Sequence, residues 1–290
     1  MKTILVPCVL ALSLLAFPTA AAEITLATQA SNFAMDDSGE FEGVAPRLGE
    51  SVSVSDRISD RLDCLVFFDR DPATGNLLGG RARYSTSFME ISAGPSFGIL
   101  NSDGGKDDAK TLFQPGLGIG MRIVIPGVVI ATADTDFALP SASFSNGQTF
   151  IQRGELAASF YLPNVLCTAR ISQRNRSSSY YLGDGVWSVT DIGLYNEAFK
   201  KGSPFRISVD FVYRIQNYSS YLLADPVKVG SLILGTGATW SPNANASFFA
   251  KINGALYSFT LNEKVSGLGD FRYDLSLGAR FVTASPKGID

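Results

Sequence analysis

Three observations on the sequence predict an all-β fold, a transmembrane antiparallel up-and-down β-barrel of about fourteen strands. Stretches of about ten residues alternate between apolar and polar side chains, which is the length expected of strands that cross a membrane. The breaks between these stretches are short and long in turn along the chain. An apolar segment at the N-terminus predicts export from the cytoplasm.

The N-terminal segment has the three parts of a secretory signal peptide. Lys2 precedes an apolar run over residues 4–16, and the small residues Ala20, Ala21 and Ala22 precede Glu23. A membrane anchor would need roughly 20 consecutive apolar residues, and this run is shorter. We therefore expect residues 1–22 to be a signal peptide cleaved between Ala22 and Glu23. Residues 23–290 then form a single barrel domain.

The composition of the chain narrows its function. No later apolar run approaches the length of a spanning helix, so a helical membrane protein is not expected. Charged residues make up 18% of the sequence, below the roughly 25% of a typical soluble domain. The net charge of -3 shows no basic excess, so we expect no nucleic-acid partner. Histidine is absent, which removes Ser-His-Asp and Cys-His nucleophile systems and imidazole metal sites. The sequence thus predicts no catalytic residue, no metal site and no cofactor.

Residues 205–216 illustrate the alternation. The apolar residues of this stretch share one parity, and the charged residues Arg206, Asp210 and Arg214 fall on the other. Residues 271–281 repeat the pattern near the C-terminus. A period of two places the two sets on opposite faces of a strand. A helix would instead group apolar residues three and four positions apart, and no long segment does so.

The breaks between stretches predict the topology. Short breaks fall at residues 59–60, 86–87, 126–127, 163–164, 201–204 and 242–245. Longer polar stretches lie near residues 34–46, 70–77, 101–112, 138–148, 174–184, 217–225 and 261–269. In outer-membrane barrels the short turns and both termini are periplasmic and the long loops are outside. Residues 24–33 and 78–100 are the ambiguous stretches, the latter because one bent strand resembles two, so a count of twelve stays open.

Aromatic residues lie near the expected strand ends, where girdles form between lipid and water. Those near the short turns are Tyr84, Phe160, Phe205, Trp240, Phe248 and Phe281. Those near the long loops are Phe97, Phe150, Tyr213 and Phe271. The alternative is that aromatic residues favour strands at any position.

Several segments resemble bacterial outer-membrane barrels. Residues 271–281 resemble the closing strand that the barrel-assembly machinery recognises, although residues 282–290 follow the late aromatic residue. Residues 87–95 and 162–168 resemble segments of predicted barrels of spirochaetes of the treponeme type. In size and expected strand number the chain is similar to small monomeric porins. This resemblance implies a monomer in the bacterial outer membrane, with membrane lipid, the assembly machinery, and small solutes or ions as its partners.

Charged residues on the polar parity predict the lining of the lumen. They are Arg81, Arg83, Glu90, Arg122, Arg153, Glu155, Arg170, Arg206, Asp210, Arg214, Lys251, Arg272, Asp274 and Arg280. The alternative is the solvated face of a soluble sheet, because alternation alone does not distinguish the two. Basic residues outnumber acids in this set, which predicts a mild preference for anions. Opposed charges on one strand, such as Arg153 with Glu155 and Arg272 with Asp274, could instead brace the wall.

Two acidic pairs invite other interpretations. Asp134 with Asp136, and Asp107 with Asp108, could be paired acids or calcium ligands. A calcium site needs several converging oxygen ligands, and no calcium-loop spacing accompanies either pair. We therefore expect solvated charges in or beside loops.

Two further features have structural explanations. Gly116, Gly118 and Gly120 are spaced two apart, and close packing in a curved sheet explains them better than a phosphate loop, which should open a helix. Cys64 and Cys167 have lipid-face parity on strands about six apart around the wall. A disulfide needs Cα atoms within about 7 Å, so both are expected to remain free thiols.

These observations favour a porin-like channel for passive diffusion of small hydrophilic solutes or ions, without covalent chemistry. The alternative is an adhesin or structural barrel with a blocked lumen, whose exposed loops carry the function. A membrane-embedded hydrolase or acyltransferase is disfavoured, because the common nucleophile systems use histidine.

Overall fold

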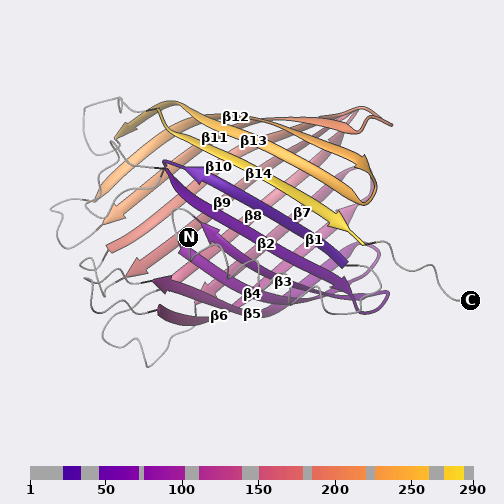
Figure 1. Ribbon diagram of the computed structural model, residues 1–290, viewed down its shortest axis with the longest axis horizontal. Helices are drawn as coiled ribbons and strands as arrows, with labels where there is room; N and C mark the ends of the chain where they lie inside the picture. The colour runs from indigo at the N-terminus through magenta and orange to yellow at the C-terminus, as the bar shows by residue number, and fades with distance from the viewer. Residues whose placement is uncertain are drawn as a thin grey trace, which may run out of the picture.

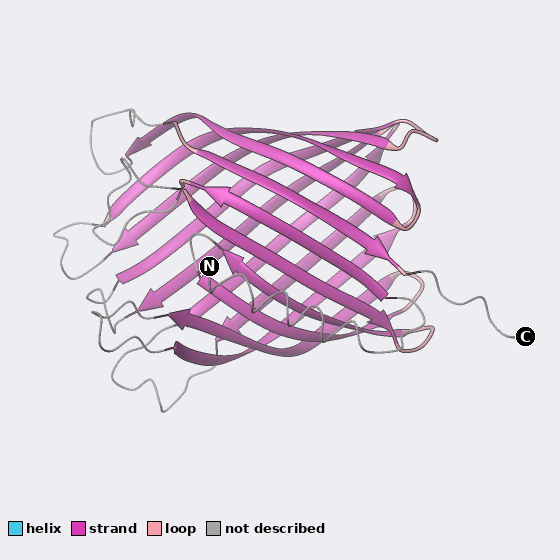
Figure 2. Ribbon diagram, viewed as in Figure 1, coloured by secondary structure: helices cyan, strands magenta, loops and turns pink. Residues whose placement is uncertain are grey.

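The computed structural model describes residues 22–33, 46–71, 75–101, 111–138, 150–178, 185–219, 226–260 and 271–283. These residues form fourteen β-strands closed into one barrel (Figure 1). Each strand pairs antiparallel with its neighbours in the chain, and β1 pairs with β14 to close the wall. The described residues contain strands and turns only (Figure 2), and none of them belongs to a helix long and apolar enough to cross a membrane.

The strands range from ten to seventeen residues, enough to cross a bilayer at a tilt. Their bounds are β1 (Ala22–Ser31), β2 (Arg47–Arg57), β3 (Leu62–Asp71), β4 (Gly75–Ser85), β5 (Met89–Asn101), β6 (Thr111–Ile125), β7 (Val129–Ala138), β8 (Phe150–Leu162), β9 (Val165–Ser178), β10 (Gly185–Phe199), β11 (Phe205–Ser219), β12 (Val227–Asn243), β13 (Ala246–Thr260) and β14 (Tyr273–Val282).

The predicted barrel of fourteen strands is confirmed. Residues 78–100 hold two strands, β4 and β5, and the expected first strand is β1. The expected long break at residues 70–77 is wrong, because only three residues separate Asp71 from Gly75. Strands β9 and β11 also run further than expected, to Ser178 and Ser219. The sequence at these ends is polar at consecutive positions, so the alternation disappears although the backbone pairing continues.

The expected signal peptide lies almost wholly outside the described residues and stays a prediction. Ala22, the residue before the expected cleavage point, is the first residue of β1. Its backbone N–H donates a hydrogen bond of 2.8 Å to Oγ1 of Thr283, just beyond the end of β14. Both described ends of the chain therefore lie at the same end of the barrel (Figure 1).

The two faces of the wall have opposite chemistry. On the outer face, Leu156, Ile171 and Ile192 are cross-strand neighbours on β8, β9 and β10, and all three are exposed. On the inner face, Arg272 and Asp274 are buried. A soluble sheet would bury its apolar face and expose its charged face. The reversed arrangement therefore selects the membrane-barrel interpretation over the solvated sheet.

Aromatic rings follow one another on the outer face at the short-turn end. Phe205 stacks on Trp240 with ring centroids 6.5 Å apart, and Trp240 stacks on Phe248 at 5.6 Å. Phe248 meets Phe281 edge to face at 5.9 Å. Tyr84 and Phe160 are also exposed near this end. This row of rings has the position that a girdle at the lipid–water boundary requires.

The aromatic residues expected in a girdle at the long-loop end do not form one continuous row of rings. Phe97 and Phe271 are exposed on the outer face, and Phe271 stacks on Tyr273. Tyr213 stacks on Phe259 at 6.5 Å. The side chain of Phe150 lies outside the described residues. The girdle at this end stays a prediction.

Both cysteines are free, as the strand assignment predicts. Cys64 lies on β3 and Cys167 on β9, with five strands between them along the wall. Mass spectrometry of protein unfolded without reductant should therefore detect two free thiols and no Cys64–Cys167 peptide. Detection of that cross-linked peptide would contradict the strand order.

Candidate functional site

The interior of the barrel contains a charged cavity of about 610 Å³. Its walls come from strands on all sides, including β3, β4, β8, β9, β11 and β14. Eight of the fourteen residues predicted for the lumen line it: Arg81, Arg83, Glu90, Arg153, Glu155, Arg170, Arg214 and Asp274.

The other six lie elsewhere on the inner parity. Arg206 is bonded to Glu197 at 2.8 Å near the short-turn end, and Arg280 is bonded to Glu23 at 2.7 Å. The remaining four are Arg122, which is exposed, Arg272, which is buried, and Asp210 and Lys251, which form an ion pair.

Sequence reasoning missed six charged residues of the cavity: Asp69, Asp71, Asp134, Asp136, Arg174 and Asp191. The prediction of solvated loop charge for Asp134 and Asp136 is wrong, because both belong to β7 and lie in an ion-pair cluster with Arg81. Asp134 and Asp136 share the parity of Thr132, which indicated that they lie on one face of a strand. The polar stretch that follows β7 made it difficult to see where the strand ends. The pair Asp107 and Asp108 lies outside the described residues.

Two glycines allow Arg81 to cross the inner wall. Arg81 lies on β4 and its partner Asp136 on β7, so the side chain must pass over β5 and β6. Gly94 and Gly118 are cross-strand partners on these two strands. A Cβ atom on Gly118 would overlap the guanidinium of Arg81, and one on Gly94 would overlap the backbone of β4. The expectation that Gly118 serves close packing is confirmed, and its neighbour is an arginine.

A chain of ion pairs crosses the cavity. Asp71 on β3 pairs with Arg174 on β9, whose guanidinium also lies 3.4 Å from Asp191 on β10. Asp191 accepts two hydrogen bonds from Arg214 on β11, at 2.8 and 2.9 Å. Arg214 in turn donates one of 3.1 Å to Asp274 on β14. Five strands are thus linked through side chains in addition to the backbone pairing of the wall.

Further ion pairs on the inner face join strands on opposite sides of the cavity, or strands that are neighbours. Asp69 on β3 binds Arg153 on β8 at 2.7 Å, across the cavity. Neighbouring strands are joined by Arg83 with Asp63 at 3.0 Å, and by Arg170 with Glu155 at 3.7 Å.

The bracing pairs expected along a strand, Arg153 with Glu155 and Arg272 with Asp274, do not appear among the ion pairs of the described residues. Residues two apart on one face are separated by about 7 Å along the strand, whereas directly opposed residues on neighbouring strands have Cβ atoms about 5 Å apart. Glu155 binds Arg170 on β9, which lies diagonally across from it, since the register pairs Glu155 with Ser172 and Arg170 with Ala157.

The balance of positive and negative charges in the cavity differs from that of the fourteen lumen residues predicted from the sequence. Its lining has six arginines and eight carboxylates, and the carboxylates are Asp69, Asp71, Glu90, Asp134, Asp136, Glu155, Asp191 and Asp274. The expected mild preference for anions therefore loses its basis, because it depended on counting basic residues in excess.

An apolar contact lies beside the ion-pair chain. Phe33, just beyond β1, is buried against Val212 and Ile233 on the inner wall. Its carbonyl oxygen accepts a hydrogen bond of 2.6 Å from Gln216, and the guanidinium of Arg214 lies 4.6 Å from the centre of its ring. The chain thus turns inward where β1 ends, and narrows the interior at the level of Arg214.

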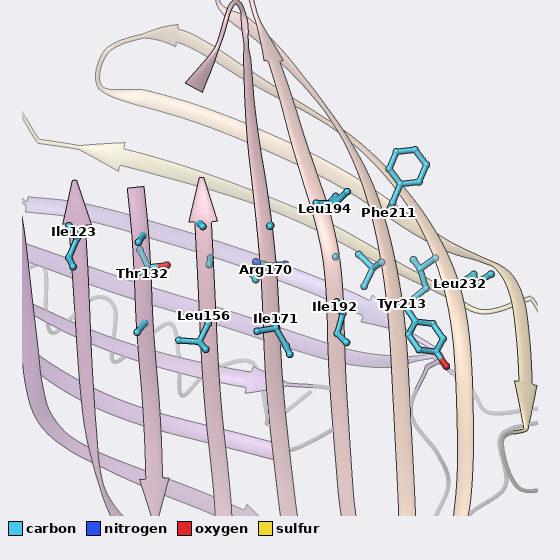
Figure 3. Close-up of a pocket in the computed structure, with 18 of the residues that line it drawn as sticks. Ile123, Thr132, Leu156, Arg170, Ile171, Ile192, Leu194, Phe211, Tyr213 and Leu232 are labelled. Atoms are coloured by element: carbon cyan, nitrogen blue, oxygen red, sulfur yellow. The ribbon is translucent and has the colours of Figure 1, made fainter. Parts of the chain in front are cut away.

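The outer face bears an apolar groove of about 930 Å³ over β6 to β13. Figure 3 shows Leu156, Ile171 and Ile192 side by side on three neighbouring strands of its lining. Small residues such as Ala158 and Ala169 lie between these larger side chains. Lipid chains fill such a surface in a membrane.

Among the described residues, no cluster of His, Cys, Asp and Glu side chains has the size needed to hold a metal ion. No protein-family model matches the sequence, and no curated protein matches it.

Solved structures are similar to this chain in fold. An outer membrane channel from Pseudomonas putida F1 is 9% identical, with a TM-score of 0.50, covering 92% of this chain and 97% of that chain. The monoaromatic hydrocarbon channel CymD is 9% identical, with a TM-score of 0.49 and coverage of 91% and 88%. An anion-selective porin from Comamonas acidovorans is 9% identical, with a TM-score of 0.42 and coverage of 91% and 98%. The resemblance to treponeme barrels stays a prediction. In architecture, the chain is an outer-membrane type of β-barrel with fourteen strands.

Proposed function

We propose that this protein is a porin-like channel of the bacterial outer membrane, through which small hydrophilic solutes or ions diffuse passively. The observation that carries this proposal is the charged cavity of about 610 Å³ inside a closed wall whose outer face is apolar. A barrel of this strand number is wide enough to hold water as well as side chains. No step of covalent chemistry is required.

The proposal includes export by the signal peptide and insertion by the barrel-assembly machinery, with short turns and termini in the periplasm. The protein would act as a monomer surrounded by lipid. The opposite chemistry of the two faces supports this placement, because lipid contacts one face and water the other.

Refolded protein in a planar lipid bilayer tests the function. We expect stepwise single-channel currents that scale with the number of inserted molecules. Protein that inserts, and that migrates as a folded barrel before boiling, yet passes no current above leak would contradict the proposal.

The charge balance of the cavity predicts a mild preference for cations, because its carboxylates outnumber its arginines. Asp134 and Glu155 are cross-strand partners, and their side chains are 54% and 44% exposed, the most accessible carboxylates of its ion pairs. The variant Asp134→Asn/Glu155→Gln should shift the reversal potential in a salt gradient towards anions. An unchanged reversal potential would show that these carboxylates do not control selectivity.

A second candidate is a structural or adhesive barrel with a blocked lumen. The ion pairs that cross the cavity favour it, because they occupy space through which solutes would pass. The same bilayer recordings distinguish the two, since a blocked barrel inserts without conducting.

A further inference from the structure

The two ion pairs that cross the interior join walls that face each other. In the closed strand order, five strands lie between β3 and β9 on one side and seven on the other. Neighbouring strands can pair their charges without narrowing the lumen, as Arg83 and Asp63 do. Asp71 with Arg174 and Asp69 with Arg153 instead place four charged side chains across it.

These side chains are held in position by further contacts. Arg174 is fixed between Asp71 and Asp191, and Asp191 is fixed by Arg214. Arg174 and Arg214 therefore each bind carboxylates on two strands, and the bidentate pairing of Arg214 with Asp191 restricts its orientation. The ion pairs that cross the interior are therefore held in one arrangement by neighbouring side chains. Charged side chains that only face the lumen would rotate freely.

The outer groove lies on the same part of the wall. Its lining includes Leu156 and Ala158 on β8, and Ala169 and Ile171 on β9. These are the two strands whose inner faces carry Arg153 and Arg174. The outer groove and the crossing ion pairs thus lie on the same two strands, with the groove nearer the short-turn end.

Some polar atoms of the residues that line the cavity are themselves shielded from water. Among the described residues, Nε of Arg153, Nε of Arg170 and Oδ1 of Asp274 are buried without a hydrogen-bond partner. An unpaired buried polar atom is unfavourable. The ion pairs offset this cost, and water would satisfy the same atoms if the cavity widened.

We propose that Asp69–Arg153 and Asp71–Arg174 form the constriction of this channel and determine its conductance and its size limit. This inference rests on the proposed channel function and names the residues that regulate passage. Breaking both pairs should release β8 and β9 from β3, admit water to the unpaired atoms, and widen the lumen.

The test compares Asp69→Asn/Asp71→Asn with wild type in planar bilayers at one salt concentration. We expect the single-channel conductance to rise at least two-fold, and larger sugars to enter in liposome swelling. Asp63→Asn is the matched control, because it removes a carboxylate of the same strand whose ion pair, among the described residues, is with Arg83 on the neighbouring β4. Asp69→Glu/Asp71→Glu should stay near wild type, because it keeps both charges.

Folding is checked by mobility before and after boiling. If the double variant does not fold, Asp69→Asn alone is tested, because it keeps the more buried pair of Asp71 with Arg174. This single variant should also raise the conductance, but by less than is expected of the double variant. A silent wild type with a conducting double variant would contradict the channel function and show that these pairs block the lumen.

Two outcomes contradict different parts of the proposal. If wild type conducts and the double variant behaves like Asp63→Asn, the constriction is wrong and the channel stands. If every folded variant is silent, the channel function fails, and the constriction with it.

Discussion

Replacing Arg214 with methionine is expected to lower the free energy of unfolding by about 3–5 kcal/mol. Among the ion pairs of the described residues, Arg214 is the side chain that links Asp191 on β10 to Asp274 on β14. Its removal leaves Asp274 buried without its positive charge, and leaves Asp191 with Arg174 alone. An uncompensated buried charge costs far more than the pair gains. Denaturant titration of protein folded in lipid vesicles measures this loss.

The matched control is Arg206→Met on the same strand. Arg206 is 56% exposed and binds Glu197 near the short turns, whereas Arg214 is 12% exposed. Exposed pairs contribute about 0–1 kcal/mol, so this variant should unfold close to wild type. Equal losses in the two variants would show that the buried ion-pair chain does not stabilise the barrel.

Replacing Phe211 with arginine should cost about 2–4 kcal/mol of stability in the membrane. Phe211 is exposed on the outer face of β11, within the strand rather than at its end. An arginine there faces hydrocarbon, which cannot solvate its charge. The yield of folded protein in vesicles and its unfolding midpoint should both fall.

Phe205→Arg provides a control for depth on the same strand. Phe205 is similarly exposed but lies at the short-turn end beside Trp240, where an arginine can reach water. Near the interface the cost falls to about 0–1 kcal/mol. Phe211→Leu should insert normally, because it keeps the surface apolar. A larger loss for Phe205→Arg than for Phe211→Arg would contradict the placement of the strand in the bilayer.

Several parts of the site could be predicted from the sequence, because they depend only on residues that are close together in the chain. Parity alone placed Arg81, Arg153 and Arg214 on the inner face, since neighbouring side chains in a strand point in opposite directions. The strand count placed Cys64 and Cys167 too far apart for a disulfide. The carboxylates Asp134 and Asp136 were missed because the polar stretch that follows β7 hid where the strand ends.

The sequence by itself determined the barrel, its strand number, its short turns and the opposite chemistry of its two faces. These follow from a period of two and from the spacing of breaks, both of which are properties of neighbouring residues. The partners of the charges were decided only by the tertiary structure. Asp71 and Arg174 are distant in sequence, and they meet because closure of the barrel brings β3 opposite β9. Alternation fixes the face on which a side chain lies, but the curvature and register of the closed sheet fix which charge it meets.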